Sequence, residues 1–316
     1  MSEPTLLAVL GATATGKSAL ALALAERWNG EIINCDSTAV YRGFDIGTDK
    51  VPMDARRGIP HHLIDIVDPT EVYTAARFAE DASRIAREIH ARGRLPIVVG
   101  GTGFYYRALT RGLFPGPAAD DAVRQRLERT GDRRGNPFLH RMLARVDAPS
   151  AARIQPNDRK RMIRALEVFF LTGQPLTAHF AGTVSPTAGM RVIALALQIP
   201  SALTAARVAR RVDQQFARGL FDEIRGLLAS GVPESARPFG GLVYRQALEH
   251  LHGVRDLDAT RELIVRENRH YAKRQRTWLR SEPDLEWFDG PGESPATMAA
   301  VMTALAPRLQ PDNPLT

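Results

Sequence analysis

An apolar run that leads into a glycine-framed loop constrains the fold of this chain more than any other feature. Residues 5–10 are Thr-Leu-Leu-Ala-Val-Leu, residues 11–18 are Gly-Ala-Thr-Ala-Thr-Gly-Lys-Ser, and an Ala/Leu-rich run over 19–25 follows. A strand, this loop and a helix, in that order, form the context that a phosphate-binding P-loop requires. Glycines let successive backbone N–H groups turn toward one anion, and the helix adds its positive N-terminal end. The sequence therefore predicts a diphosphate or polyphosphate site at 11–18.

Two side chains of this loop extend the prediction. Lys17 is placed to reach the more distal phosphate, and the Ser18 hydroxyl is placed to ligate Mg²⁺. The alternative is a chance Gly/Ala-rich turn between a core strand and a core helix, which the spacing and both flanks disfavour. We expect the phosphate ligand to be bound by Gly11, Ala12, Thr13, Ala14, Thr15, Gly16, Lys17 and Ser18.

Charge and cysteine content narrow the class of protein. The net charge is +7, which favours a polyanionic partner such as a nucleic acid. The single cysteine, Cys35, excludes an internal disulfide and a Cys-based zinc cluster. No apolar run is long enough to cross a bilayer and the N-terminus lacks a secretory signal pattern, so we expect a cytoplasmic protein that is not bound to a membrane.

The distribution of apolar runs predicts an α/β fold. Short apolar runs at 5–10, 31–35, 96–100 and 192–197 are typical of central parallel strands, and residues 74–92 have helical periodicity. We expect a P-loop NTPase-like parallel sheet core with an inserted small all-helical domain. The expected parts are 1–114 (first part of the core), 115–190 (inserted helical domain), 191–290 (remainder of the core with a basic helical region) and 291–316 (flexible tail).

Asp36 is the first candidate for catalysis, because it follows the apolar run 31–35 and so lies at the carboxyl edge of the sheet, beside the P-loop. The run 96–100 continues instead into Gly101-Thr102-Gly103, without the acid that an ordinary P-loop ATPase uses to hold Mg²⁺ or position water. From position alone, Asp36 is a metal ligand, a general base or a cap for the next turn.

Several blocks of the sequence together resemble the signature of the tRNA dimethylallyltransferases. They occur in the order of that family and cover most of residues 8–280. The blocks are Gly11–Ser18, Asp36–Lys50, Pro60–Asp65, Gly100–Tyr105, Asn157 through Val168, and Lys273–Arg280.

The resemblance implies a specific reaction. The P-loop would hold the diphosphate of dimethylallyl diphosphate, with Mg²⁺, and the dimethylallyl group would pass to N6 of the adenosine immediately 3′ of the tRNA anticodon. Asp36 looks like the base that takes the amine proton, Thr102 looks like a contact near that amine, and Arg211 looks like the cation that stabilises the leaving diphosphate. From spacing alone, Arg211 is more typical of a solvated basic face, which it would share with Arg207 at i,i+4.

The acceptor implied by the resemblance is the anticodon stem-loop of tRNA, which the inserted domain 115–190 and the basic helical region within 191–290 would bind. We expect the protein to be a monomer. The target base must leave its stack to react, and basic blocks would bind the RNA, although each alone is also typical of a solvated face. Two departures affect this set: Ala39 stands where the family often has Gln, and Val243 stands where a Gly commonly precedes the Tyr. The expected tRNA contacts are Asp36, Ser37, Thr38, Ala39, Thr102, Arg124, Lys160, Arg161, Met162, Ile163, Arg164, Gly240, Gly241, Leu242, Val243, Tyr244, Arg245, Lys273, Arg274 and Arg276.

Three other functions remain open at this point. An adenylate (free-nucleotide) isopentenyltransferase would share the core and Asp36 but has less need for the inserted domain and the basic C-terminal region. A P-loop small-molecule kinase would use the same loop for ATP. A non-catalytic, ATP-switched RNA-binding protein would leave Asp36 without a proton-transfer role.

Overall fold

The computed structural model describes residues 3–114 and 116–309. The chain forms two compact units, one made of the segments up to Thr110 and from Pro186 onward, and the other of Arg111–Ser185. Each unit has its own buried apolar cluster, so each is described by itself.

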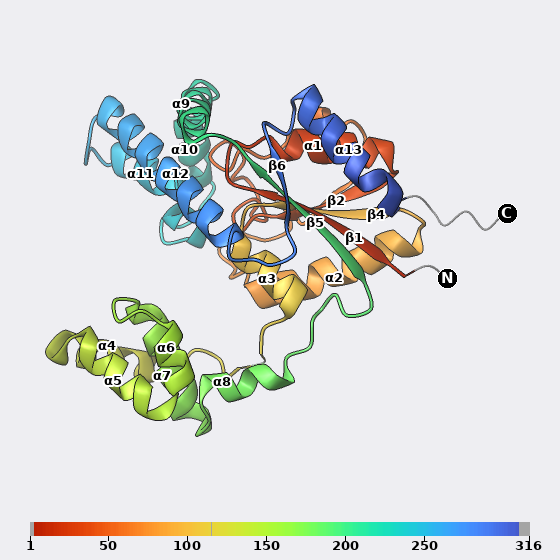
Figure 1. The fold of residues 1–316 in the computed structure, drawn as a ribbon. Helices are drawn as coiled ribbons and strands as arrows, with labels where there is room; N and C mark the ends of the chain where they lie inside the picture. The colour runs from red at the N-terminus through yellow and green to blue at the C-terminus, as the bar shows by residue number, and fades with distance from the viewer. Residues whose placement is uncertain (1–2, 115, 310–316) are drawn as a thin grey trace. The chain divides into compact units, whose positions relative to one another are not determined.

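The larger unit is built on a six-stranded parallel sheet (Figure 1). The strand order is β3-β2-β4-β1-β5-β6, so β1 lies between β4 and β5, and Val9 is in register with Val99 and Leu195. The strands are β1 (Thr5–Gly11), β2 (Gly30–Cys35), β3 (His61–His62), β4 (Leu95–Gly100), β5 (Arg191–Gln198) and β6 (Glu286–Asp289).

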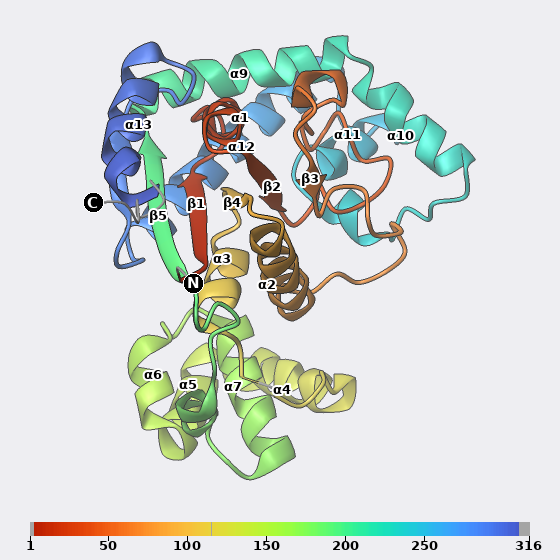
Figure 2. The ribbon, with the colours of Figure 1, turned by 90° about the vertical axis from the view of Figure 1, so that its right-hand side faces the viewer.

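Both faces of the sheet are covered by helices, which is why its central strands are apolar at nearly every position. Leu7 and Val9 of β1 pack with α1 (Lys17–Arg27) and α13 (Pro295–Leu309) on one face. Leu6 and Ala8 pack on the other face with α2 (Ala75–Ala91) and α3 (Gly103–Arg111) (Figure 2). The predicted α/β class with a parallel sheet is confirmed.

Four helices extend this unit beyond the sheet: α9 (Ser201–Ala217), α10 (Leu220–Ala229), α11 (Tyr244–Leu251) and α12 (Leu257–Leu279). Helix α12 packs along α9, and a 3-10 turn, Arg237–Gly240, precedes α11. The rings of Phe44, Phe239 and Tyr244 make edge-to-face contacts, with centroids 4.9 Å apart for Phe44 against each of the other two. This aromatic cluster joins the loop after β2 to the helices.

The smaller unit is all helical. Asp120, Asp147 and Asp158 each cap the N-terminus of the helix that follows them in the chain. The described part of this unit contains α4 (Asp121–Arg134), α5 (Asn136–Val146), α6 (Ala148–Arg153), α7 (Arg159–Thr172), α8 (Leu176–His179) and a 3-10 turn at Phe180–Gly182.

The structure differs from the sequence-based expectation in the C-terminal segment and in two short edge strands. The expected flexible tail 291–316 is wrong for α13, in which Thr297, Val301 and Leu305 recur every four residues and are buried against the sheet. Residues 310–316 of that expectation lie outside the described residues. The short edge strands β3 and β6 were also not expected, because two and four residues carry too little periodicity to predict a strand.

None of the helices in the described ranges combines the length and the apolar character needed to span a bilayer.

Candidate active site

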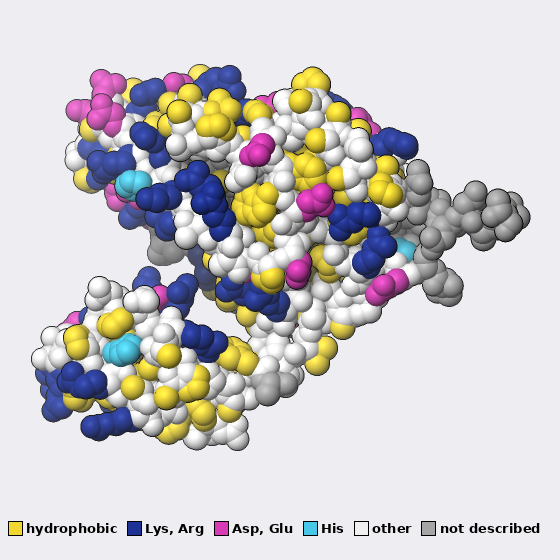
Figure 3. All heavy atoms as spheres, in the orientation of Figure 1, with side chains coloured by type: hydrophobic (Ala, Val, Ile, Leu, Met, Phe, Trp, Pro, Cys, Tyr) yellow, Lys and Arg dark blue, Asp and Glu magenta, His cyan; other side chains and the backbone are white. Residues whose placement is uncertain are grey.

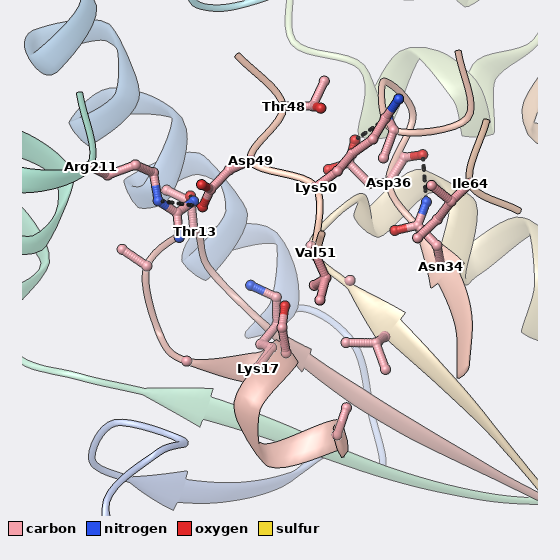
Figure 4. Close-up of a pocket in the computed structure, with 18 of the residues that line it drawn as sticks. Thr13, Lys17, Asn34, Asp36, Thr48, Asp49, Lys50, Val51, Ile64 and Arg211 are labelled. Carbon is pink, nitrogen blue, oxygen red and sulfur yellow. Dashed lines mark hydrogen bonds and ion pairs between the residues drawn. The ribbon is translucent and has the colours of Figure 1, made fainter. Parts of the chain in front are cut away.

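A pocket of about 440 Å³ opens at the carboxyl ends of β1, β2 and β4 (Figure 4). This is the edge at which parallel α/β sheets bind their ligands. The loop 11–18 forms one wall, the end of β2 with Asp36 forms another, and the turn 48–52 together with α9 and α12 closes the rest.

The loop between β1 and α1 adopts the strained backbone that a P-loop needs. Gly16 (φ 85°) and Ala14 (φ 65°) are left-handed, and α1 begins directly afterwards at Lys17. The Lys17 ammonium donates to the Ala12 carbonyl at 2.7 Å, so it folds back over the loop and borders the pocket. The N-terminus of α1 and this ammonium together favour an anion at this position.

Burial and the nearby Arg211 guanidinium lower the pKa of Lys17 to about 7, while the Asp36 carboxylate opposes that shift. Two cations that face one pocket repel each other unless an anion lies between them. A bound diphosphate would supply that anion.

Ser18 borders the same pocket with an exposed side chain. Within the described ranges, no group of three or more His, Cys, Asp or Glu side chains could hold a metal ion. Mg²⁺ commonly uses one or two protein oxygens and completes its shell with phosphate oxygens and water. The Ser18 hydroxyl fits that mode, in which the cation binds together with a diphosphate.

Asp36 serves as a turn cap and also borders the pocket. Its Oδ1 accepts the N–H groups of Thr38 (2.8 Å) and Ala39 (3.2 Å). Among the described residues Oδ2 makes no hydrogen bond, so the cap occupies only one of the two carboxylate oxygens. Thr102 lies beside this turn, because its hydroxyl accepts the Ser37 N–H at 3.3 Å.

Arg211 reaches this pocket from α9, 198 positions away from the P-loop in sequence. Its Nη1 donates to the Thr13 hydroxyl at 2.9 Å, and its Nε pairs with Asp49 at 3.0 Å. Arg207 borders the pocket from the same helix face, one turn earlier, and pairs with Glu293. The structure therefore brings Arg211 to the site as the resemblance implied.

Helix α12 supplies two pocket residues that the sequence analysis did not single out. Gln275 accepts the Thr13 N–H at 2.8 Å and donates to the Gly101 carbonyl at 2.9 Å. Burial, and then the Asp36 charge, raise the pKa of Tyr271 to about 12, against the effect of a hydrogen bond to Thr102. Gln275 belongs to the block Lys273–Arg280, but no spacing in that block shows which of its residues face the pocket.

The opposite face of α12 is basic. Four cations at positions i, i+3, i+7 and i+10 of this helix border a second pocket of about 300 Å³, which His270 also lines. We call these four residues the α12 cation stripe: Arg266, Arg269, Lys273 and Arg276. None of the four pairs with a carboxylate of the described residues, and Lys and Arg side chains gather over α12 in Figure 3. The neighbouring Arg274 instead lies over the Tyr271 ring, 5.7 Å from its centroid.

The segment 240–245 is only partly accessible. Tyr244 is fully buried, and its hydroxyl donates to Glu223 Oε1 (2.6 Å) and accepts the Gly47 N–H (2.9 Å). Val243 is also buried, at φ 77°, a conformation that a β-branched residue rarely adopts, and its N–H donates to Gln246 Oε1. The expectation that these two side chains contact tRNA is therefore wrong, whereas Arg245 and Gly240 are exposed and Gly241 and Leu242 are half-buried.

In the helical unit, too, some of the expected tRNA contacts are exposed and others are buried. Lys160 and Arg161 are exposed on α7, but Met162 and Ile163 belong to the buried cluster, so the expectation of tRNA contacts by these two apolar side chains is wrong. The physical reason is the helical period, which turns 162 and 163 inward when 160 and 161 face outward.

Arg124 and Arg164 share a buried carboxylate in this unit. Arg124 Nε donates to Glu167 Oε1 at 2.9 Å, and Arg164 Nη1 donates to Glu167 Oε2 at 2.6 Å. Glu167 also accepts the Asp120 N–H at 2.8 Å. Both arginines therefore have a structural role, while each guanidinium remains partly exposed.

A sequence profile of the family described as IPP transferase matches residues 39–282. The chain belongs to this family. It is 47% identical to the tRNA dimethylallyltransferase of Geobacter metallireducens over 94% of this chain and 96% of that one, and 47% identical to that of Solibacter usitatus over 95% and 98%. The family resemblance read from the sequence blocks is confirmed.

Solved structures give the same result. The full-length tRNA isopentenylpyrophosphate transferase of Bacillus halodurans has a TM-score of 0.72 and 36% identity, with 98% of this chain and 97% of that chain covered. A eukaryotic dimethylallyltransferase described as acting on tRNA has a TM-score of 0.79 and 28% identity, with 96% and 78% covered. The family fold therefore extends over nearly the whole chain.

Proposed function

We propose that this chain transfers the dimethylallyl group of dimethylallyl diphosphate to N6 of the adenosine immediately 3′ of a tRNA anticodon, with release of diphosphate. The proposal rests on one observation: the same pocket is lined by an anion-binding loop and by a carboxylate that has no ion pair among the described residues. The P-loop, Lys17 and Arg211 line one part of it, and Asp36 lines another.

The acceptor side of the reaction is assigned to Asp36 and Thr102. The adenine amine is a weak nucleophile, since its lone pair is delocalised into the ring, and it must lose a proton as the N6–C bond forms. Two carboxylates line the pocket, and Asp49 is paired with Arg211 and Arg218. Asp36 is then the base that accepts the amine proton, with Thr102 positioned beside it to contact the acceptor.

Binding of the donor diphosphate is assigned to the P-loop with Lys17, and to Arg211 of α9. As the bond between the allylic carbon and the diphosphate oxygen breaks, negative charge collects on the departing diphosphate. Backbone N–H groups of the loop, the Lys17 ammonium and the Arg211 guanidinium are preorganised around that position. Mg²⁺ on Ser18 would neutralise further charge on the same group.

The site fits this reaction better than ATP hydrolysis or phosphoryl transfer. Strand β4 continues into Gly101, Thr102 and Gly103, so no acid stands there to orient water or a metal as in an ordinary P-loop ATPase. An alkyl transfer hydrolyses no phosphoanhydride and needs no such residue.

The acceptor is proposed to be tRNA on the basis of charge. We further propose that the protein binds it as a monomer in the cytoplasm. The α12 cation stripe has no carboxylate partners in the described part of the chain, as a surface for RNA phosphates requires. Lys160 and Arg161 add exposed positive charge in the helical unit. Binding energy from such contacts would offset the few kcal/mol needed to unstack the target base.

The test is a transfer assay with labelled dimethylallyl diphosphate, Mg²⁺ and either unmodified tRNA or AMP as acceptor. Label on tRNA and none on AMP supports the proposal. Label on AMP alone would identify a free-nucleotide enzyme. ATP consumption without prenyl transfer would contradict the assignment of the P-loop and of Asp36.

A further inference from the structure

Asp49 has no part in the chemistry described so far, although it borders the same pocket. Its Oδ2 lies 3.0 Å from Arg211 Nε, and its Oδ1 lies 3.5 Å from Arg218 Nη1. Figure 4 shows the Asp49 carboxylate and the Arg211 guanidinium side by side above the P-loop. Asp49 is therefore in contact with the cation assigned to the leaving diphosphate.

The turn that carries Asp49 is held by side chains from two other elements, the half-buried Glu223 and the buried Tyr244. Glu223 Oε2 accepts the N–H groups of Asp45 (2.9 Å) and Ile46 (2.7 Å). The Tyr244 hydroxyl accepts the Gly47 N–H at 2.9 Å. A carboxylate and a phenol from α10 and α11 thus fix the backbone of this turn.

The side chain of Lys50 fixes the other end of the turn. Its ammonium is nearly fully buried, donates to the Tyr41 carbonyl (2.7 Å) and Asp45 (2.7 Å), and pairs with Asp65. Asp49, between Gly47 and Lys50, takes φ 56°, a left-handed conformation that Asp tolerates better than most residues. The direction of the Asp49 carboxylate is set by a turn that is held at both ends.

The contact with Asp49 decides which part of Arg211 faces the ligand. A guanidinium has five N–H donors in a fixed planar fork. Asp49 occupies the Nε side and Thr13 accepts from Nη1. Without Asp49, the neighbouring like charge of Lys17 would favour other rotamers of Arg211.

We propose that Asp49 is a positioning residue that holds Arg211 in its productive orientation toward the P-loop anion. The proposal rests on the function proposed above for the donor site. Asp49 acts through Arg211 and does not itself touch the reacting atoms. Because the pair is about one-third exposed, its loss should change the melting temperature little.

The experiment is a double-mutant cycle on the affinity for inorganic diphosphate in the presence of Mg²⁺, measured by calorimetry on the full chain. With Asp49 present, Arg211→Ala is expected to weaken binding about 10- to 100-fold. In the Asp49→Ala background the same change is expected to weaken binding by less than about 3-fold, since Arg211 no longer contributes. Asp49→Asn, which keeps the shape and removes the charge, provides the same comparison if the alanine variant folds poorly.

Asp222→Asn is the matched control, because it removes an exposed carboxylate that pairs with Arg225 at 2.8 Å away from the pocket. It should leave the effect of Arg211→Ala unchanged. An equal loss from Arg211→Ala with and without Asp49 would overturn the proposal. If the cycle shows the coupling but the wild-type protein transfers no prenyl group, the proposed function fails while the positioning role stands.

Discussion

Gln275 and Thr13 are 262 positions apart in the sequence, and a 2.8 Å hydrogen bond joins the Gln275 side-chain oxygen to the Thr13 backbone N–H. The Gln275 amide nitrogen donates in turn to the Gly101 carbonyl at 2.9 Å. One side chain of α12 thus ties the P-loop, where the donor diphosphate is proposed to bind, to the β4–α3 turn that carries Thr102. The helix that presents cations on its outer face therefore also fixes both halves of the pocket.

Gln275→Glu is expected to raise the KM for dimethylallyl diphosphate at least about 10-fold. The carboxylate would face the Gly101 carbonyl without a proton to donate, and it would place a negative charge beside the anion site. Steady-state kinetics with donor titration measures the change. Gln214→Glu is the matched control, because Gln214 borders the same pocket but makes no bond to the P-loop. An equal increase in both variants would mean that charge alone, and not the bridge, explains the effect.

Diphosphate binding is expected to weaken as the pH rises above about 7. Burial and the Arg211 charge lower the pKa of Lys17 to about 7, so the unliganded protein loses the ammonium above that pH. A bound anion favours the charged form, so binding takes up a proton, and affinity falls up to about tenfold per pH unit while the free form is neutral and the bound form is charged. The ligand itself becomes more negative with pH, which would change affinity in the opposite direction.

Calorimetry at several pH values, in buffers of different ionisation enthalpy, measures both the affinity and the proton uptake. Lys17→Arg, whose charge does not titrate in this range, should abolish the proton uptake. No proton uptake by the wild type, or the same uptake by Lys17→Arg, would contradict the assignment of Lys17.

The α12 cation stripe is expected to govern the salt dependence of tRNA binding. Arg269→Ala should lower the slope of log affinity against log salt concentration by about 1, because one fewer counterion is released. Arg84→Ala is the control, since Arg84 on α2 is already paired with Asp81 (3.3 Å) and Glu88 (2.9 Å). An unchanged slope for Arg269→Ala would place the RNA elsewhere on the protein.

The helical unit is expected to lose stability in acid through Glu167. Burial disfavours the charge of this carboxylate, but hydrogen bonds from Arg164, the Asp120 N–H and Arg124 outweigh it and hold its pKa below the usual value. The stabilisation is fully present above the pKa of the unfolded state and is lost as the pH falls through the folded-state pKa.

Glu167→Gln should therefore lower the free energy of unfolding by about 2–4 kcal/mol at pH 7. The difference from the wild type should shrink steadily toward pH 3. Thermal and denaturant unfolding at both pH values measures this, and a difference independent of pH would contradict the account.

The sequence predicted the parts of the molecule that depend on local pattern. The P-loop was recognised because its spacing and both flanks lie within 25 residues, and Asp36 was recognised because it follows a buried strand. The parallel sheet followed from apolar runs that are buried on both faces.

What the sequence did not predict depends on contacts between distant segments. Gln275 and Asp49 are ordinary polar residues until α12 and the turn after β2 meet the P-loop and α9. Tyr244 was expected to contact tRNA as part of the segment 240–245, but Glu223 and the Gly47 N–H hold its hydroxyl in the core. Helix α13 was missed because the expectation of a tail rested on the polar, proline-containing residues 310–316 that follow this helix.

The most direct test of the central claim is single-turnover transfer of labelled dimethylallyl to tRNA by Asp36→Asn, alongside tRNA affinity measured on the same protein. The amide keeps a side-chain oxygen for the Thr38 and Ala39 N–H groups but cannot accept the amine proton. We predict a loss in rate of about 10²- to 10⁴-fold with tRNA affinity within about 3-fold of the wild type. A rate near that of the wild type, or a loss of tRNA binding as large as the loss of rate, would contradict the assignment of Asp36 as the base.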